Sequence, residues 1–168
     1  YSKDLNIKSE NITYNTLDQK ISSNSSSLIR YDLGNQIKFN SFSYLIDDDF
    51  IRLNEVNIID VADNIYSLKK AFLNINSNKL IGKDASIDFK NLNVDKNNDP
   101  RIKSNSILAD KNSIELNKAI FTTCKKNDSC PPWQISAKKI KHDKEKKIIH
   151  YDKAWLKIYD VPVFYFPK

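Results

Sequence analysis

The 168-residue chain has two glycines, two histidines, two cysteines and no methionine. Gly34 and Gly82 cannot form a glycine-rich phosphate loop, and no serine stands in a Gly-x-Ser-x-Gly nucleophile elbow. His142 and His150 flank a lysine-rich turn, so we interpret them as strand residues beside that turn. Residues Asp47–Asp49 lack the spaced ligands and the glycine of a calcium loop. We therefore predict a protein that is not an enzyme, with no catalytic residue, no metal and no cofactor.

Long apolar runs are also missing, and none approaches the roughly 20 residues that a membrane-spanning helix needs. The first residues already have strand character and no signal peptide precedes Tyr1, so we expect the natural N-terminus to lie upstream. The net charge is +6, but only three of the 27 basic residues are arginines: Arg30, Arg52 and Arg101. Because few guanidinium groups are available for bidentate contacts with phosphates and bases, this charge does not favour a nucleic-acid partner.

The sequence pattern that is present is an alternation of apolar and polar residues, which is typical of half-buried strands. Clusters of Asn, Asp and Ser separate the strand-length windows and supply the turns that glycine would otherwise provide. One window, with Ile65, Leu68 and Phe72, has helical spacing, but its Asn-rich flanks favour a strand. The clearest alternating windows are 36–42, 51–54, 85–89 and 113–117. We predict an all-β protein of short antiparallel strands.

An internal repeat places two isoleucines five residues apart. It occurs at Ile7 and Ile12, at Ile102 and Ile107, and at Ile135 and Ile140, with a weaker copy at Leu80 and Ala85. Five residues along a flat strand would put the two side chains on opposite faces. We therefore expect a bend or bulge inside each repeat, and stacking of the repeated strands on one another.

The last segment, residues 161–167, is apolar on both faces. Val161, Val163 and Tyr165 share one parity, and Phe164 and Phe166 share the other. Pro162 and Pro167 remove two backbone donors, so the segment should lie at a sheet edge or bend. We expect Phe164 or Phe166 to be more exposed than a core phenylalanine.

These C-terminal residues carry a resemblance to a known family. A cysteine-containing loop is followed by Pro131-Pro132-Trp133-x-Ile135-x-Ala137, then by Ile140-x-His142-Asp143, Tyr151-Asp152-x-Ala154-x-Leu156 and residues 161–167. This succession resembles the LptD family of lipopolysaccharide-assembly proteins, where a periplasmic domain meets an outer-membrane β-barrel. The similarity covers residues 119–168, and upstream it is one of pattern, to OstA-type repeats.

The resemblance implies a jelly-roll folded as a V-shaped β-trough, with residues 1–168 forming one domain. The barrel should follow Pro167, so the chain would be a fragment. The implied function is transport of lipopolysaccharide at the periplasmic face of the outer membrane of a Gram-negative bacterium. The implied partners are lipopolysaccharide, a periplasmic bridge protein bound by strand addition, and the lipoprotein plug of the barrel. The alternative is a structural or adhesion β-solenoid with a packed interior.

The candidate functional residues follow from alternation and from the resemblance. Apolar members of the alternating windows are expected to line the lipid groove: Ile12, Ile37, Phe39, Leu53, Ile87, Phe89, Ile107, Ile114, Leu116 and Ile135. Four residues of the last segment are expected to hand lipid to the barrel: Val161, Val163, Phe164 and Phe166.

Two further features leave alternatives open. Cys124 and Cys130 fit neither a redox motif nor a zinc knuckle. In an oxidising periplasm they form either a local disulfide, which we favour, or bridges to the barrel, as the resemblance implies. Residues 138–153 hold seven lysines and three acids, which form a solvated turn or attract phosphorylated headgroups.

Overall fold

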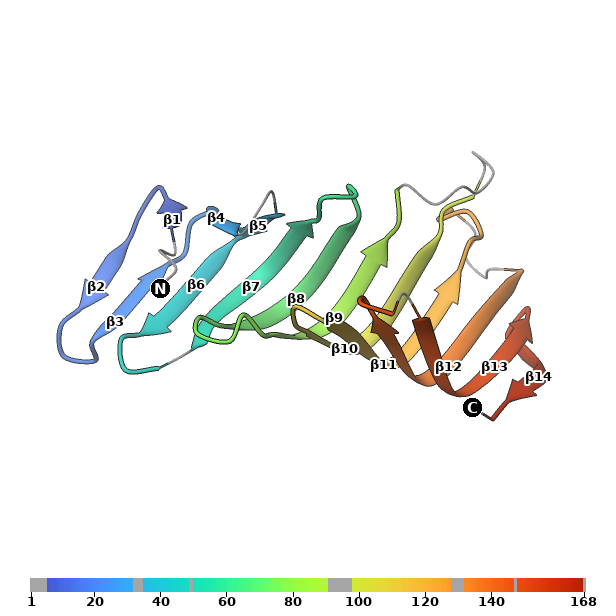
Figure 1. Ribbon diagram of the computed structural model, residues 1–168. Coiled ribbons are helices and arrows are strands. Elements are labelled where there is room, and N and C mark those ends of the chain that lie inside the picture. The colour runs from blue at the N-terminus through green and yellow to red at the C-terminus, as the bar shows by residue number, and fades with distance from the viewer. Residues whose placement is uncertain are drawn as a thin grey trace.

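The computed structural model describes residues 6–31, 35–48, 50–90, 98–127, 132–146 and 148–167. These residues form fourteen strands in one antiparallel sheet, which confirms the all-β prediction (Figure 1). No helix that is long and apolar enough to span a membrane occurs among them. The strands are β1 (Asn6–Ser9), β2 (Thr13–Asn15), β3 (Lys20–Ser23), β4 (Ser27–Tyr31), β5 (Asn35–Phe39), β6 (Ser41–Leu45), β7 (Phe50–Ile59), β8 (Ile65–Asn74), β9 (Leu80–Asp88), β10 (Arg101–Ala109), β11 (Ser113–Thr122), β12 (Trp133–Asp143), β13 (Ile148–Ile158) and β14 (Val161–Phe166).

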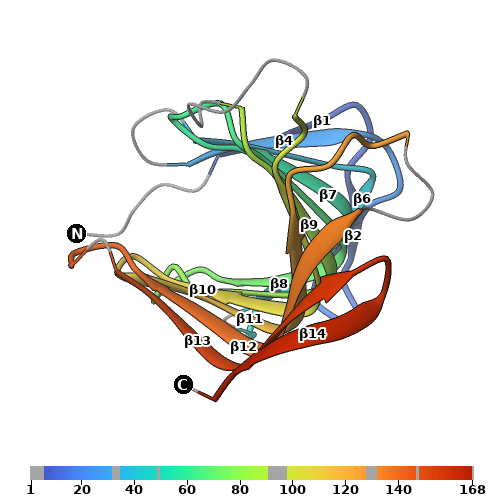
Figure 2. The same ribbon diagram turned by 90° about the vertical axis from the view of Figure 1, so that its right-hand side faces the viewer.

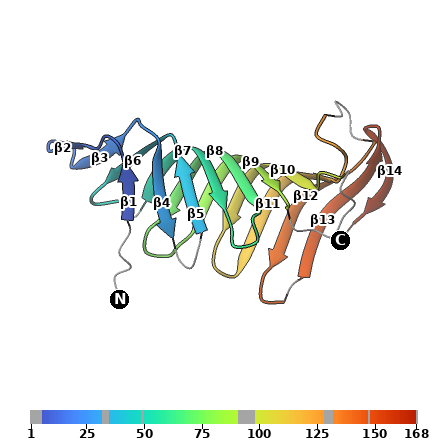
Figure 3. The ribbon, with the colours of Figure 1, turned by 90° about the horizontal axis from the view of Figure 1, so that it is seen from above.

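The sheet is folded lengthwise into a trough with two arms, which Figure 2 shows from one end. In arm A the order is β1-β4-β5, then residues 56–59 of β7 and the matching halves of β8–β13, then β14. In arm B the order is β2-β3-β6, then residues 50–54 of β7 and the other halves of β8–β13. Seen from above, the strands follow one another along the trough in nearly chain order (Figure 3).

A row of residues marks the corner where the two arms meet. Each of the strands β7–β13 has one residue that is skipped in its ladders; for example, Ser104 and Ser106 pair with Ala119 and Asn117, but Asn105 has no such partner. All members of this corner row are exposed on the outer side of the bend. The corner row is Glu55, Lys69, Asp84, Asn105, Lys118, Lys138 and Lys153.

The corner changes the parity of the side chains, as the five-residue repeat predicts. Along β7 the inward residues are Ile51 and Leu53 in arm B and Val56 and Ile58 in arm A, so the spacing is two within an arm and three across the corner. Asn105 lies between Ile102 and Ile107, and Lys138 lies in the same place between Ile135 and Ile140. The predicted bend is therefore confirmed in these two repeats.

Backbone conformation at the corner explains how the strands bend. Glu55, Asp84, Lys118 and Lys153 have φ values of 49°, 51°, 49° and 50°. A non-glycine residue in this left-handed region costs about 1–2 kcal/mol. Burying one large apolar side chain contributes about 1.5–3 kcal/mol, and each bent strand places several of them inside the trough. The strain is thus offset by the inward packing that the bend permits.

At the first end of the trough the corner becomes a complete break. The strand pairs β1/β2, β3/β4 and β5/β6 each supply one strand to each arm. Serines fill the break between β3 and β4, where Ser9 Oγ lies 2.8 Å from Ser23 Oγ and 3.0 Å from Ser25 Oγ. These hydroxyls satisfy one another where the ladders are interrupted.

Candidate functional site

The inner wall of the trough contains most of the residues that alternation predicts for the lipid groove. Six of these residues are buried in one continuous core: Ile37, Phe39, Leu53, Ile87, Ile107 and Leu116. Three are half-buried and pack against that core: Phe89, Ile114 and Ile135. Their inward position is given by their burial in, or packing against, this core, whereas their contact with lipid remains a prediction.

Ile12 is the exception and requires a correction. It lies between β1 and β2, outside both strands, and 54% of its surface is exposed. In this first repeat the strand is interrupted at the corner, since β1 ends at Ser9 and β2 begins only at Thr13. The pattern Ile7–x4–Ile12 therefore does not place its second isoleucine on the wall.

Packing inside the trough changes along its length. Ile29 and Ile51, at the first end and in the middle, have 0% exposure. Around β12–β14 the inward side chains are less covered: Ile135, Tyr151 and Leu156 are only half-buried. A cavity of about 610 Å³ opens there, lined by apolar residues such as Ile135 and Phe166 and by the basic side chains of β12. We call this end of the described trough the open end. The outermost strands at the first end are also less covered than the middle, since Ile7, Ile21 and Tyr44 are half-buried and Tyr14 is 53% exposed.

Strand β14 forms the rim of this open end. It pairs with residues 154–158 of β13 and is the outermost described strand of arm A, which confirms the edge position expected from Pro162. Phe164 and Phe166 face inward opposite Leu156 and Ala154, with ring centroids 4.7 Å apart. They are 56% and 43% exposed. This exposure is compatible with the hand-over role, which remains a prediction.

The other two hand-over residues, Val161 and Val163, are exposed as well. Tyr159 and Asp160 join β13 to β14 with φ values of 46° and 66°, as a two-residue type I′ turn requires. The Gln134 side chain donates a hydrogen bond to Asp160 Oδ1 at 2.5 Å, which attaches the turn to β12. The exposed strand is therefore held in place by its hairpin.

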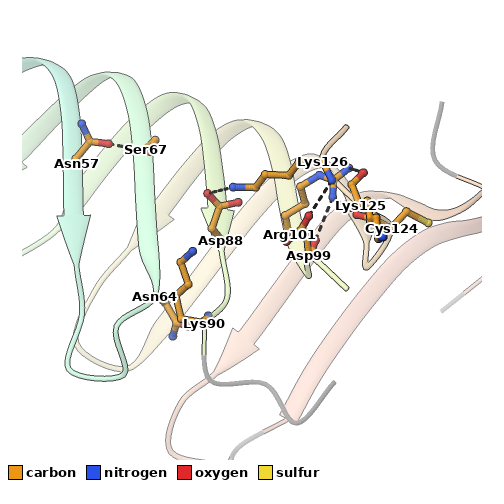
Figure 4. Close-up of polar contacts among 10 residues, drawn as sticks. All are labelled: Asn57, Asn64, Ser67, Asp88, Lys90, Asp99, Arg101, Cys124, Lys125 and Lys126. Atoms are coloured by element: carbon orange, nitrogen blue, oxygen red, sulfur yellow. Dashed lines mark hydrogen bonds and ion pairs between the residues drawn. The ribbon is translucent and has the colours of Figure 1, made fainter. Parts of the chain in front are cut away.

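Polar contacts join β9 and β10 to residues 124–126 on the outer side of arm A (Figure 4). The Arg101 guanidinium donates to the carbonyls of Asp99, at 3.1 Å, and of Cys124. Lys126 Nζ lies 2.8 Å from Asp88 Oδ2. Cys124 is buried, with Sγ 3.7 Å from the Trp133 carbonyl oxygen. Cys130 lies outside the described residues, so both disulfide alternatives stay predictions.

Residues 139–143 of β12 and 148–152 of β13 belong to arm B, and Lys139 and Lys141 lie on its outer face because Ile140 between them faces the core. Lys139 Nζ lies 2.8 Å from Glu115 Oε2, and Lys144 Nζ donates to the Asp110 carbonyl at 2.9 Å. Lys141 and Lys146 are exposed. Part of this charge is thus paired locally, and part remains at the rim of the open end.

Ionisable groups of the described residues form no cluster that could hold a metal ion. The largest pKa change concerns Tyr66, whose hydroxyl donates to Asp60 Oδ2 at 3.2 Å. Burial first, and then the Asp60 charge and hydrogen bond, raise the pKa of Tyr66. Burial also raises the pKa of Tyr151 on the inner wall. Both phenols are therefore neutral at physiological pH and act as polar tips within an apolar wall.

Sequence reasoning missed two features of the wall. Gly82 faces inward, where a Cβ would lie 2.1 Å from Leu68 Cδ2, and an isolated strand glycine was its only signal. Ile149 and Tyr151 also face inward, on the half of β13 that β14 does not pair with. The sequence of β13 alone does not show which half that is.

Comparisons with known proteins add a distant similarity of fold. No family model matches the chain, and no curated protein matches it. Ten chains of solved structures do match. One is the crystal structure of LptH from Pseudomonas aeruginosa, described as the LptA homologous periplasmic component of the conserved lipopolysaccharide transport device. It is 10% identical, with coverage of 93% of this chain and 95% of that chain and a TM-score of 0.36. Similarity at this level carries no weight in the functional argument.

Proposed function

We propose that residues 1–168 are one lipopolysaccharide-conducting domain of an LptD-type assembly protein, at the periplasmic face of the outer membrane. The observation that carries this proposal is the inner wall, where both arms present apolar side chains from β7 to β13. Acyl chains would lie against this wall without specific polar contacts, and phosphorylated sugars would stay in water at the open side. No local catalysis is needed, since each lipid is pushed along by the next.

The proposal also assigns a direction of transport. Lipid would leave at the open end, where Phe164 and Phe166 are exposed and a barrel following Pro167 would receive it. At the other end, β1 and β2 are the outermost described strands of the two arms. We assign the strand-adding bridge protein to these two edges. The lipoprotein plug would contact the barrel itself.

A second candidate is a structural β-solenoid with a dry, packed interior. It is favoured by the complete burial of Ile29, Ile51 and Leu53, which leaves no room between the arms in that part. The two functions differ in a measurable way. A conduit must separate its arms or shift its side chains to admit acyl chains, whereas a solenoid has no affinity for them.

The test is binding of purified lipopolysaccharide to the purified chain. Phe89→Asp places a carboxylate on the inner wall, where acyl chains offer it no partner, so affinity should fall by about tenfold or more. Ser86→Asp, from the outer face of the same region, is the matched control and should bind as the wild type does. Circular dichroism and urea unfolding establish that both variants are folded. Unchanged affinity of a folded Phe89→Asp protein, or no binding by the wild type, would contradict the proposal.

A further inference from the structure

Three exposed lysines on the consecutive strands β11, β12 and β13 form one end of the corner row: Lys118, Lys138 and Lys153. Neighbouring strands lie about 4.8 Å apart, so the three side chains leave the backbone within roughly 10 Å of one another. Nearer the first end, the same row alternates in sign, because Lys69 lies between Glu55 and Asp84. The three lysines thus give this part of the outer corner a single sign of charge.

The bend itself does not require lysine at these positions. Lys118 and Lys153 have φ values of 49° and 50°, a conformation that asparagine, aspartate and glycine adopt with less strain. Like charges on neighbouring strands also repel one another. Among the described residues, no ion pair joins any of the three lysines to an acid. The lysines therefore add to the cost of the bend, and residues that break a local rule without a structural gain are expected at functional sites.

A row with three large apolar side chains runs beside these lysines on the outer face of arm A. Its members lie in register on β11–β14: Ile120, Ser136, Trp155 and Tyr165. Ile120, Trp155 and Tyr165 are 39%, 40% and 40% exposed. The Trp155 and Tyr165 rings lie against each other, with centroids 4.6 Å apart. One buried alanine separates each lysine from this row along its strand, so the two rows are roughly 7 Å apart.

Together the two rows form what we call the outer patch: Lys118, Lys138, Lys153, Ile120, Trp155 and Tyr165. It lies on the face of the sheet, since β11, β12 and this half of β13 each pair with a strand on both sides. The patch therefore offers side chains and no free backbone groups. Tryptophan and tyrosine favour the boundary between water and lipid, because each ring has an apolar body and a polar tip. Lysine meets phosphate by non-directional Coulomb attraction, and its apolar stem can lie along lipid.

We propose that the outer patch docks the trough on a membrane surface that contains anionic phospholipid. Trp155 and Tyr165 would lie among the headgroups, and the three lysines would lie beside them at the level of the phosphates. A second copy of the chain fits less well, because the net charge is +6 and its patch would bring three more lysines against the first three. The outer patch is on the opposite side of the sheet from the inner wall. The inference therefore holds whether or not the trough carries lipopolysaccharide.

The experiment adds lipid vesicles to the purified chain. One set of vesicles contains phosphatidylcholine alone, and in the other about one third of the lipid is phosphatidylglycerol, which is anionic. The chain should sediment with the anionic vesicles and much less with the neutral ones, and added salt should reduce the binding. In Trp133→Phe, Trp155 is the only tryptophan, and its fluorescence should shift to shorter wavelength when anionic vesicles are added.

Two variants of the outer patch have matched controls elsewhere on the outer side. Lys138→Gln should weaken binding to anionic vesicles about fivefold, whereas Lys69→Gln, between two acids on the same corner row, should change it by less than about twofold. Trp155→Ser should weaken binding about tenfold or more. Leu108→Ser should have little effect, since Leu108 is 39% exposed but lies on the outer face of arm B. Circular dichroism establishes that all four variants are folded.

Three results would overturn the proposal. The first is equal binding of the wild-type chain to both kinds of vesicle, or binding to neither. The second is vesicle binding that Lys138→Gln and Trp155→Ser reduce no more than their controls do, because the lipid would then lie elsewhere, such as on the inner wall. The third is self-association of the wild-type chain in sedimentation without vesicles, lost in Trp155→Ser, because a second copy would then cover the outer patch.

Discussion

Replacement of Gly82 by alanine should destabilise the trough, although most glycine-to-alanine changes in a strand do the opposite. Gly82 does not have a left-handed φ, so its backbone accepts alanine, and the smaller entropy of the unfolded chain would contribute about 0.4–1 kcal/mol of stability. The new Cβ would lie 2.1 Å from Leu68 Cδ2 and 2.9 Å from Ile107 Cγ2. Both neighbours are buried in the core and have little space to move.

Overpacking of this kind costs about 1–3 kcal/mol, so the free energy of unfolding should fall by about 0.5–2 kcal/mol in Gly82→Ala. Urea unfolding followed by circular dichroism measures this change, and with a slope of about 2 kcal/mol per M the midpoint should drop by about 0.3–1 M. The double variant Gly82→Ala/Leu68→Ala separates the clash from other effects. Leu68→Ala alone should cost about 2–5 kcal/mol, and the methyl group added by Gly82→Ala should recover about 1 kcal/mol of it by filling the space.

Two outcomes would refute this reasoning. Gly82→Ala could be as stable as the wild type, which would mean that Leu68 moves aside without loss. Alternatively, the two substitutions could add without coupling, which would mean that their side chains do not share the space at the corner.

Further predictions concern the corner, the pH dependence and a buried hydroxyl. Lys118 has a φ of 49°, which glycine adopts without strain, so Lys118→Gly should raise the free energy of unfolding by about 1 kcal/mol. Lys103→Gly, within a regular strand, is the control and should lower it by about 0.5–1 kcal/mol. Urea midpoints that shift in the same direction in both variants would contradict this. Burial and Asp60 raise the pKa of Tyr66, so its neutral phenol contributes stability below pH about 10 that is lost as the pH rises above that value. Tyr66→Phe should therefore flatten the fall of the free energy of unfolding at alkaline pH. The same fall in both proteins, measured by urea unfolding at several pH values, would contradict this. Ser104 Oγ is buried and has no hydrogen-bond partner among the described residues, so Ser104→Ala should raise the free energy of unfolding by about 1 kcal/mol in thermal or urea unfolding. A lower free energy of unfolding would contradict this and indicate an ordered water bound to the hydroxyl.

Most of the fold was predictable because the relevant signals are local. Alternation over short windows identifies strands. The helical spacing of Ile65, Leu68 and Phe72 does not mark one face of β8, because its inward residues Tyr66, Leu68, Ala71 and Leu73 are spaced by two within an arm and by three across the corner. The repeat at Ile102 and Ile107 predicted a bend for the same reason. A parity change within one strand is visible in its own sequence.

The rest depends on contacts between distant strands, which periodicity does not report. The alignment of the bends into one corner requires the registers of seven strands, and these are set across loops of different length. Ile12 matches the repeat but lies where the chain breaks at Ser9. The exposure of Ile149 follows from the end of β14 at Phe166, and the sequence of β13 does not indicate it.

The most direct test of the central claim, that the inner wall conducts lipopolysaccharide, is site-specific photocrosslinking in living cells. Ile135 and Ser136 are adjacent in β12, both half-buried, with Ile135 on the inner face and Ser136 on the outer face. A photoreactive residue at position 135 should crosslink to lipopolysaccharide, and the same residue at position 136 should not. Equal crosslinking from both positions, or crosslinking from position 136 alone, would contradict the conduit.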